Sequence, residues 1–401
     1  MKRPLHRLSP LFSSHEYQAM LYEYYKSYQH DTPVICNEDG SVYVTHYADC
    51  LHLLNSPSCK REAPNGGGPF SKLATPTSAL EKMIRHWMVF MDPPRHDLVR
   101  KAFASAFLAK PINRMEPMIR ARVRQLLEQW PATGNVEAIQ QLAFPLPVMV
   151  IADILGVPEQ DGMQFQSWAL QLTEALDTAE EASIHRGEGV ALELKAYFEH
   201  LVATRNQLPE HCLINTVENT ADSKLTAEEY VYGYAFLLWA GHETTKNLIA
   251  NGILTLIQHP VQLAQLQQEP ALLESAIEEI LRYECPVQKI SRWTHEDVSF
   301  GEYLVPAGTL VTALIGAANR DPATFEHPDQ FDITRSKNRH IAFGTGIHHC
   351  LGALLARTEA RIVLGELLPR LQHLTITDYQ WRTFSAFRSL ERLHLNVGLP
   401  C

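Results

Sequence analysis

The chain has 401 residues, 45% of them hydrophobic and 20% charged, and a formal net charge of −10 at pH 7. This composition is ordinary for a globular protein, and the negative charge argues against nucleic acid or an anionic membrane surface as the main partner. The longest nearly apolar stretch, Tyr230–Ala240, is too short to span a bilayer, and the N-terminus lacks the apolar run of a secretory signal. We therefore expect a cytoplasmic protein with no membrane partner and no nucleic-acid partner.

The predicted elements, taken in chain order, are mainly helical. The first feature is a glycine-rich loop at Ala63–Phe70, which is either a surface connection or a mobile lid over an entrance. Apolar residues at helical spacing predict helices over the ranges Ile112–Trp130, Val148–Leu155, Gln164–Leu176, Ala191–Leu208 and Ala271–Tyr283. Strand patterns are fewer and shorter, at Gly40–Thr45, Val298–Phe300, Thr309–Ile315 and Leu374–Ile376. The mixture indicates a mostly helical body with small β-sheets attached.

One predicted helix is much longer than the others. Thr226 and Glu229 have the spacing of a capping box, and the helical pattern then continues to Gln258. A helix of this length, roughly 50 Å at 1.5 Å per residue, crosses a whole domain. Its centre, Phe236–Thr245, is apolar on all sides and then abruptly polar, which a buried helix does not tolerate without a reason. We therefore expect a functional polar notch there. The zinc motif H-E-x-x-H is excluded because Lys246 occupies the position of the second histidine.

The cysteines are scattered and contain no C-x-x-C pair, so neither a disulfide framework nor a zinc ribbon is indicated. Most are expected to be small buried side chains, but Cys350 follows a glycine-rich turn and precedes an apolar helix that starts at Leu351. The positive end of that helix favours the thiolate over the thiol. Gly346 and Gly352 remove side chains near the sulfur, which lets a flat cofactor approach, and Phe343 could pack against that cofactor.

Other interpretations of this segment are weaker. A nucleotide-binding G-x-G-x-x-G loop would need glycine where His349 stands. A zinc site would have His348, His349 and Cys350 side by side but no second cluster at a useful spacing. A cysteine nucleophile would lack a clear partner, and a structural cysteine in a tight turn stays possible for any single cysteine.

The run Phe343–Gly352 fits F-x-x-G-x-x-x-C-x-G at every fixed position and resembles the haem-binding loop of the cytochrome P450 family. Four further segments resemble motifs of this family in kind and order, namely Met91–Arg100, Ala240–Thr245, Glu279–Arg282 and Phe331–Arg335. The resemblance implies one large, triangular, mainly α domain over residues 1–401, with haem b held between the long central helix and the cysteine loop. It is closest to the soluble bacterial type.

The resemblance also implies roles for individual residues. Cys350 is the expected iron ligand, and Glu243 and Thr244 are the expected acid and alcohol that deliver protons to bound oxygen. The remaining expected haem contacts are His96, Arg100, Arg292 and His348 as propionate partners, with Phe343, Gly346, Gly352, Ala240 and Gly241 around the ring. Glu279, Arg282 and Arg335 are expected to form a buried structural network behind the cysteine loop. Phe236, Leu237, Val287, Ile290 and Phe387 are the expected pocket walls, although plain core packing explains each about as well, and they suggest an apolar or aromatic substrate.

The implied activity is that of a monooxygenase of secondary metabolism, a monomer that takes electrons from a ferredoxin and its reductase. Acidic ferredoxins would need cations on the proximal face, for which the candidates are Lys101, Arg339, Arg357 and Arg361. A peroxygenase or a phenol-coupling enzyme on the same scaffold stays open as an alternative. A haem-based sensor is disfavoured because a sensor has no need of Glu243 and Thr244.

Overall fold

The computed structural model describes residues 14–65, 78–178, 181–218, 225–383 and 386–398. Most of the predicted glycine-rich loop at Ala63–Phe70 lies outside these ranges. The helices are α2 (His15–Ala19), α3 (Leu21–Asp31), α4 (Tyr47–Asn55), α5 (Ala79–Arg85), α6 (Arg95–Ala104), α7 (Ala109–Leu127), α8 (Pro145–Leu155), α9 (Gly162–Thr178), α10 (Glu181–Ala203), α11 (Leu213–Glu218), α12 (Ala227–Gln258), α13 (Pro260–Gln268), α14 (Leu273–Tyr283), α15 (Ile315–Ala318) and α16 (Ala353–Leu371). None of the helices described is both long and apolar enough to cross a bilayer.

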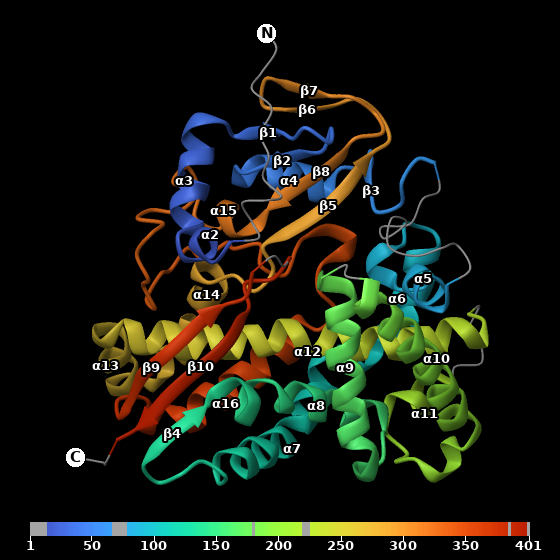
Figure 1. Ribbon diagram of the computed structural model, residues 1–401, viewed down its shortest axis with the longest axis vertical. Helices are drawn as coiled ribbons and strands as arrows, with labels where there is room; N and C mark the ends of the chain where they lie inside the picture. Colours follow the sequence, from blue (N-terminus) through green and yellow to red (C-terminus); the bar gives the residue numbers. More distant parts are fainter. Residues whose placement is uncertain (1–13, 66–77, 179–180, 219–224, 384–385, 399–401) are drawn as a thin grey trace. The chain divides into compact units, whose positions relative to one another are not determined.

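The strands form small sheets, as the sequence predicts. They are β1 (Val34–Cys36), β2 (Val42–Val44), β3 (Cys59–Lys60), β4 (Gly134–Glu137), β5 (Lys289–Thr294), β6 (Val298–Phe300), β7 (Tyr303–Val305), β8 (Leu310–Leu314), β9 (Leu374–Trp381) and β10 (Leu390–Val397). One sheet has the order β1-β2-β8-β5-β3, a second has β4-β10-β9, and β6 pairs with β7 as a hairpin (Figure 1). Within the first sheet β2 and β8 are parallel and the other pairs are antiparallel.

The backbone contacts divide the chain into two compact units. The first comprises Met1–Lys60, Val123–Ala143 and Thr244–Cys401, and the second comprises Arg61–Arg122 and Phe144–Glu243. The first unit holds the sheets, α14, α16 and the cysteine loop, whereas the second holds α5, α6 and the helices α8 to α11. The residues of α12 are shared between the two units.

The long helix α12 begins and ends as the sequence predicts (Figure 1). The backbone N–H of Glu229 donates to the hydroxyl of Thr226 at 3.3 Å, and the N–H of Thr226 donates to the carboxylate of Glu229 at 2.8 Å, so the capping box is present. The same carboxylate pairs with Arg95. At the other end Pro260 opens α13, and because proline lacks an N–H donor, α12 stops at Gln258.

The predicted start of α10 was wrong. The helix begins at Glu181, well before Ala191, although its two glycines lower helix propensity, and one of them, Gly187, serves packing. A Cβ atom at Gly187 would lie 2.6 Å from the Cβ of Ala175 on α9, so the glycine allows α9 and α10 to approach closely. Its predicted end was also late, since the α-helix stops at Ala203.

Candidate functional site

Cys350 lies at the end of a turn that only glycine readily builds. Gly344 and Gly346 have φ angles of 66° and 67°, in the left-handed region that side chains disfavour. The N–H of Cys350 donates to the carbonyl oxygen of Phe343 at 2.9 Å, and the N–H of His349 donates to that of Gly346 at 3.0 Å. The backbone of the turn therefore fixes where the cysteine stands.

Cys350 differs from the other described cysteines in its exposure to solvent. Of the cysteines that the structure describes, Cys350 is exposed, Cys36 is half-buried and the others are buried. The helix that follows begins at Ala353, with Gly352 as its N-cap, so the predicted start at Leu351 was two residues early. Cys350 accordingly stands just before the N-terminus of α16, where the positive end of the helix dipole favours a thiolate.

The two glycines beside the sulfur differ in what surrounds them. A Cβ atom at Gly346 would lie 2.8 Å from Oδ1 of Asn55 on α4, so packing within this unit requires the glycine. A Cβ atom at Gly352 would meet nothing within 4 Å. Gly352 therefore leaves open space next to Cys350, which suits a flat ligand.

Behind the loop, the predicted carboxylate–guanidinium network is assembled on α14. Glu279 and Arg282 are fully buried, and Arg335 is 10% exposed. Nε of Arg335 donates to Oε2 of Glu279 at 3.1 Å. Asn338 and the backbone N–H of Asp332 also donate to this carboxylate, so Glu279 holds the segment that leads into the cysteine loop.

A second carboxylate, which the sequence analysis missed, lies next to the first. Arg357 on α16 donates from Nε to Oε1 of Glu278 at 2.6 Å and from Nη2 to Oε2 at 2.8 Å, while Nε2 of His340 donates to Oε2 at 3.0 Å. The guanidinium of Arg357 also lies over the ring of Phe343, 4.4 Å from its centroid. Burial raises the pKa of Glu278, but the hydrogen bonds from Arg357 and His340 outweigh it and lower the pKa to about 2. The only signal in the sequence was its position beside Glu279.

In the second unit, the polar notch of α12 contains a buried histidine that the sequence analysis did not single out. Nδ1 of His242 donates to the carbonyl oxygen of Leu238 at 2.9 Å, which leaves Nε2 as the acceptor in the neutral ring. This Nε2 lies 3.4 Å from the hydroxyl of Thr173 on α9 and 3.9 Å from Oε2 of Glu243. Glu243 is 3% exposed, so both groups of the notch are withdrawn from water.

Gly241 has a packing role. A Cβ atom there would lie 2.6 Å from Cδ1 of Ile151, so the glycine lets α8 and α12 approach each other. Its neighbours Ala240 and Thr244 are half-buried. The close contact with α8 accounts for Gly241 independently of any ligand.

The four predicted propionate partners are divided between the units. His96 and Arg100 stand four residues apart on α6, in the second unit, where His96 is 1% exposed and its Nδ1 lies 2.9 Å from Oδ1 of Asp97. Arg292 on β5 and His348 in the turn before Cys350 belong to the first unit. Arg292 is 4% exposed, and a buried cation of this kind suits an anionic group.

The predicted pocket residues of the first unit come together in part. Val287 and Phe387 face each other in an isolated antiparallel bridge, although they are a hundred residues apart in sequence. Cδ1 of Ile290 lies 3.8 Å from the ideal Cβ position of Gly344, beside the cysteine turn.

The two pocket candidates on α12 are packed within the second unit. Phe236 is buried against Trp87, with 5.7 Å between ring centroids, and Leu237 is also buried. Trp87 in turn stacks on Trp239 at 5.0 Å. Phe236 is therefore a member of an aromatic cluster of this unit.

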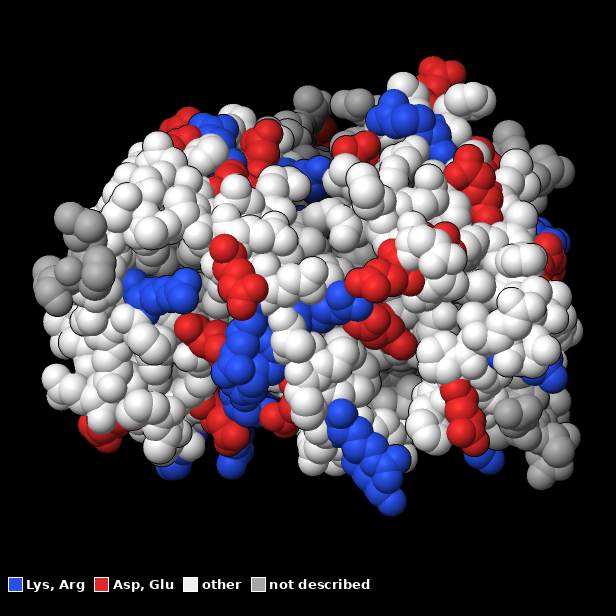
Figure 2. Space-filling view, turned by 90° about the horizontal axis from the view of Figure 1, so that it is seen from below, with Lys and Arg blue, Asp and Glu red and all other residues white. Residues whose placement is uncertain are grey.

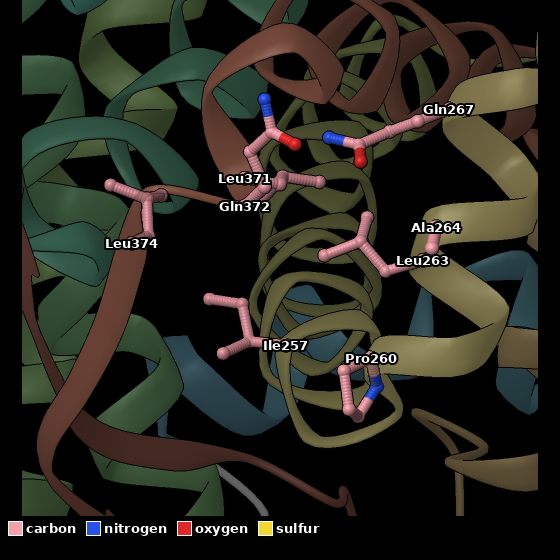
Figure 3. Close-up of a pocket in the computed structure, with 8 residues that line it drawn as sticks. All are labelled: Ile257, Pro260, Leu263, Ala264, Gln267, Leu371, Gln372 and Leu374. Carbon is pink, nitrogen blue, oxygen red and sulfur yellow. The ribbon is translucent and has the colours of Figure 1, made fainter. Parts of the chain in front are cut away.

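A pocket of about 210 Å³ is lined by none of these residues (Figure 3). It is lined by the end of α12, by α13 and by the junction of α16 with β9, through Ile257, Pro260, Leu263, Ala264, Gln267, Leu371, Gln372 and Leu374. This volume is below the range typical of ligand pockets, about 300–1,000 Å³. None of the predicted substrate contacts lines it.

The candidate docking cations are unequal in exposure. Lys101 and Arg339 are exposed and Arg361 is half-buried, whereas Arg357 is engaged by Glu278. On the face shown in Figure 2, basic and acidic side chains are interspersed and no single sign covers the surface.

The comparisons with known proteins agree with a haem-thiolate class of enzyme. The family model described as Cytochrome P450 matches residues 199–387. The biotin biosynthesis cytochrome P450 of Bacillus subtilis is 38% identical over 355 residues, which are 88% of this chain and 89% of the relative. The cytochrome P450 monooxygenase PikC of Streptomyces venezuelae is 38% identical over 308 residues, 75% of this chain and 73% of the relative.

Solved structures show the same fold. The crystal structure of P450BioI in complex with an acyl carrier protein ligated to hexadec-9Z-enoic acid has a TM-score of 0.89 at 36% identity, covering 96% of this chain and all of that one. The polyketide synthase cytochrome P450 PksS of Bacillus subtilis has a TM-score of 0.86 at 30% identity, covering 97% and 99%. The chain belongs to the cytochrome P450 family. It is a monooxygenase of the mainly α P450 fold, and members of this family bind haem through a cysteine thiolate and need a redox partner and a small-molecule substrate.

The residues present fit haem. Cys350 is an exposed cysteine at the end of a fixed turn, and nothing lies within 4 Å of the Cβ position of the nearby Gly352, as an approaching flat ring requires. The buried Arg292 matches the carboxylates that haem carries.

Proposed function

We propose that Cys350 is the thiolate ligand of haem b and that the chain oxidises a small apolar or aromatic molecule in secondary metabolism. The observation that carries the proposal is the exposed Cys350 at the end of the Gly344–Gly346 turn, just before the positive end of α16. When bound, haem supplies the iron at which dioxygen is activated, and the thiolate pushes electron density toward that iron. Phe343, whose carbonyl oxygen accepts from the Cys350 N–H, shields the sulfur.

Glu243 and Thr244 supply the protons that the oxidation needs. Glu243 takes protons from water and passes them to the hydroxyl of Thr244, which holds them at the oxygen side of the site. The low exposure of Glu243 supports this role because a buried carboxylate exchanges protons only along a defined route. His242, whose Nε2 lies 3.9 Å from the Glu243 carboxylate, belongs to the same buried polar group.

The cofactor is oriented by cationic and donor side chains. His96, Arg100, Arg292 and His348 hold the two propionates, since buried carboxylates need such partners. Ala240 and Gly241 lie beside the cofactor on α12, where Gly241 also packs against Ile151, and Gly352 gives clearance beside the sulfur. Gly346 supports the cofactor indirectly, because it lets the cysteine turn pack against Asn55. The buried network of Glu279, Arg282 and Arg335 has a structural role and keeps the cysteine loop in place.

The pocket walls that we propose are Phe236, Leu237, Val287, Ile290 and Phe387. The bridge between Val287 and Phe387 and the position of Ile290 beside the turn support the last three. Since a relative was solved with a carrier protein ligated to hexadec-9Z-enoic acid, an unbranched acyl chain is the first substrate class to test, both free and linked to a carrier.

Two electrons come from a separate donor, for which we propose a ferredoxin with its reductase. The exposed Lys101 and Arg339 and the half-buried Arg361 are the proposed docking cations. We also propose that the protein is a monomer and that it acts in the cytoplasm.

The deciding experiment is the absorption spectrum of the reduced, carbon monoxide-bound protein, for the wild type and Cys350→His. We expect the red-shifted Soret band typical of thiolate ligation in the wild type and its loss in the variant. A conventional haem band in well-folded wild type would show that Cys350 is not the ligand.

A further inference from the structure

One carboxylate accepts hydrogen bonds from residues at both ends of the cysteine loop. His340 precedes Phe343 and Cys350 in the chain, and Arg357 follows them on α16, yet both donate to Glu278 on α14. Arg357 uses two nitrogens and both oxygens of the carboxylate, the bidentate geometry that fixes a guanidinium most firmly. The side chain of Glu278 on α14 therefore connects the two ends of the segment from residue 340 to residue 357.

The charges of Glu278 and Arg357 cancel. The carboxylate of Glu278 carries one negative charge and the guanidinium of Arg357 one positive charge. Nε2 of His340 donates to Glu278, and Nδ1 accepts the N–H of Ala342 at 3.3 Å, so both ring nitrogens are hydrogen-bonded. Glu278 stays ionised because its pKa of about 2 is far below neutral pH.

Arg357 also contacts the loop directly. Its guanidinium lies 4.4 Å from the centroid of the Phe343 ring, a cation–π distance, and Phe343 accepts the backbone hydrogen bond of Cys350. The charge pair is thus connected to the sulfur-bearing residue through a single intervening residue. Both members are about one-third exposed, at 34% for Arg357 and 32% for Glu278, so the pair is only partly screened by water.

We infer that Glu278 and Arg357 are positioning residues that hold Phe343 and set the charge balance behind the thiolate, and thereby set the reduction potential of the bound haem. This inference rests on the proposed function of Cys350. It also removes Arg357 from the docking surface for the electron donor, because its nitrogens are already bound to Glu278. A positive charge left near the iron favours the reduced state, which carries one more electron, and a negative charge disfavours it.

The test is the midpoint potential of the holoenzyme in Glu278→Gln, Arg357→Gln and the double variant. We expect a higher potential in Glu278→Gln, a lower one in Arg357→Gln, and a value near wild type in the double variant, in which the charges cancel again. Arg357→Lys keeps the charge and should stay near wild type. Glu391→Gln makes the same charge change as Glu278→Gln at an exposed position of β10 and should not shift the potential.

A merely structural role would move both single variants in the same direction and leave the double variant no closer to wild type, and that result would overturn the inference. Unchanged potentials in all variants would also overturn it. The carbon monoxide spectrum of each variant separates this outcome from a failure of the proposed function: a thiolate band with unshifted potentials contradicts the charge balance alone. If Glu278→Gln does not fold, the two variants of Arg357 still test the inference. A lower potential in Arg357→Gln together with an unchanged one in Arg357→Lys would support it, and any other result would overturn it.

Discussion

Arg282 places every N–H of its guanidinium in a hydrogen bond, and Glu279 takes two of them. Nε and Nη2 donate to the Glu279 carboxylate at 2.8 and 2.7 Å, and neither side chain is exposed. The remaining donors reach backbone carbonyl oxygens of Asn319, Pro328 and Gln330. This one residue therefore connects α14 to the segments that follow α15 and lead toward the cysteine loop.

Replacing Arg282 by lysine should destabilise the protein strongly. Lysine offers three donors in place of five and leaves the buried Glu279 poorly paired, which typically costs about 3–5 kcal/mol. The midpoint of urea unfolding measures the effect. Arg335→Lys, at a position that is 10% exposed, is the matched control and should lose less. Equal losses at the two positions would contradict the central place of Arg282.

Gly346→Ala should lower stability even without cofactor. The new Cβ would need a left-handed backbone and would lie 2.8 Å from Asn55. Thermal unfolding of the apoprotein is the measurement. Gly352→Ala serves as the control because its Cβ would meet nothing within 4 Å, so apoprotein stability should be unchanged. A weaker haem affinity in Gly352→Ala alone would support its proposed role in clearance.

Glu359 on α16 makes stability depend on pH. Complete burial raises the pKa of its carboxyl well above the usual value, so the folded protein keeps a proton that the unfolded chain loses above about pH 4.5. Stability contributed by this group is therefore lost as pH rises, by up to about 1.4 kcal/mol per unit. Glu359→Gln should gain stability relative to wild type as the pH rises above about 4.5.

The control for that series is Glu391→Gln, at an exposed position on β10. The free energy of unfolding, measured at several pH values, should differ between this variant and wild type by the same amount at each pH. If the gap between Glu359→Gln and wild type does not widen with pH, the carboxyl is not held neutral in the fold.

Thr244→Ala should uncouple oxygen consumption from product formation. Without the hydroxyl, protons from Glu243 are no longer held in place, and reducing equivalents should leave as hydrogen peroxide. The ratio of product to oxygen consumed measures this. Thr244→Ser keeps the hydroxyl and should restore most of the ratio, whereas equal coupling in the wild type and Thr244→Ala would refute the role.

Neutralising Lys101, Arg339 or Arg361 should slow reduction by an acidic ferredoxin. The effect should be largest at low salt, because exposed charges are screened over about 10 Å at 0.1 M ionic strength. Stopped-flow reduction at several salt concentrations is the measurement. A rate that does not respond to salt would argue against a charged docking surface.

Much of the site could be predicted from the sequence because its motifs are local. The turn before Cys350, the capping box of Thr226 and Glu229 and the pair of Glu279 and Arg282 depend on spacings of a few residues, and the structure contains each of them. The end of α12 before Pro260 is likewise encoded in one residue.

Features that depend on distant contacts could not be predicted in this way. The partners of Glu278 lie 62 and 79 positions further along the chain, and nothing in the local pattern distinguishes it from a solvated glutamate. Gly187 and Gly241 weaken the helix signal, but their purpose becomes visible only when the helices packed against them are known. The helix start at Ala353 differs from the predicted one because the backbone of Gly352 already caps the helix.

Two consecutive carboxylates on α14 have no partner in common among the hydrogen bonds described above. Glu279 binds Arg282, Arg335, Asn338 and the Asp332 backbone, whereas Glu278 binds His340 and Arg357. For protein engineering, residues 278 and 279 can therefore be varied independently although they are adjacent in sequence. A library that varies residues 278, 340 and 357 can search for altered electron uptake while every side chain of the neighbouring network is kept constant.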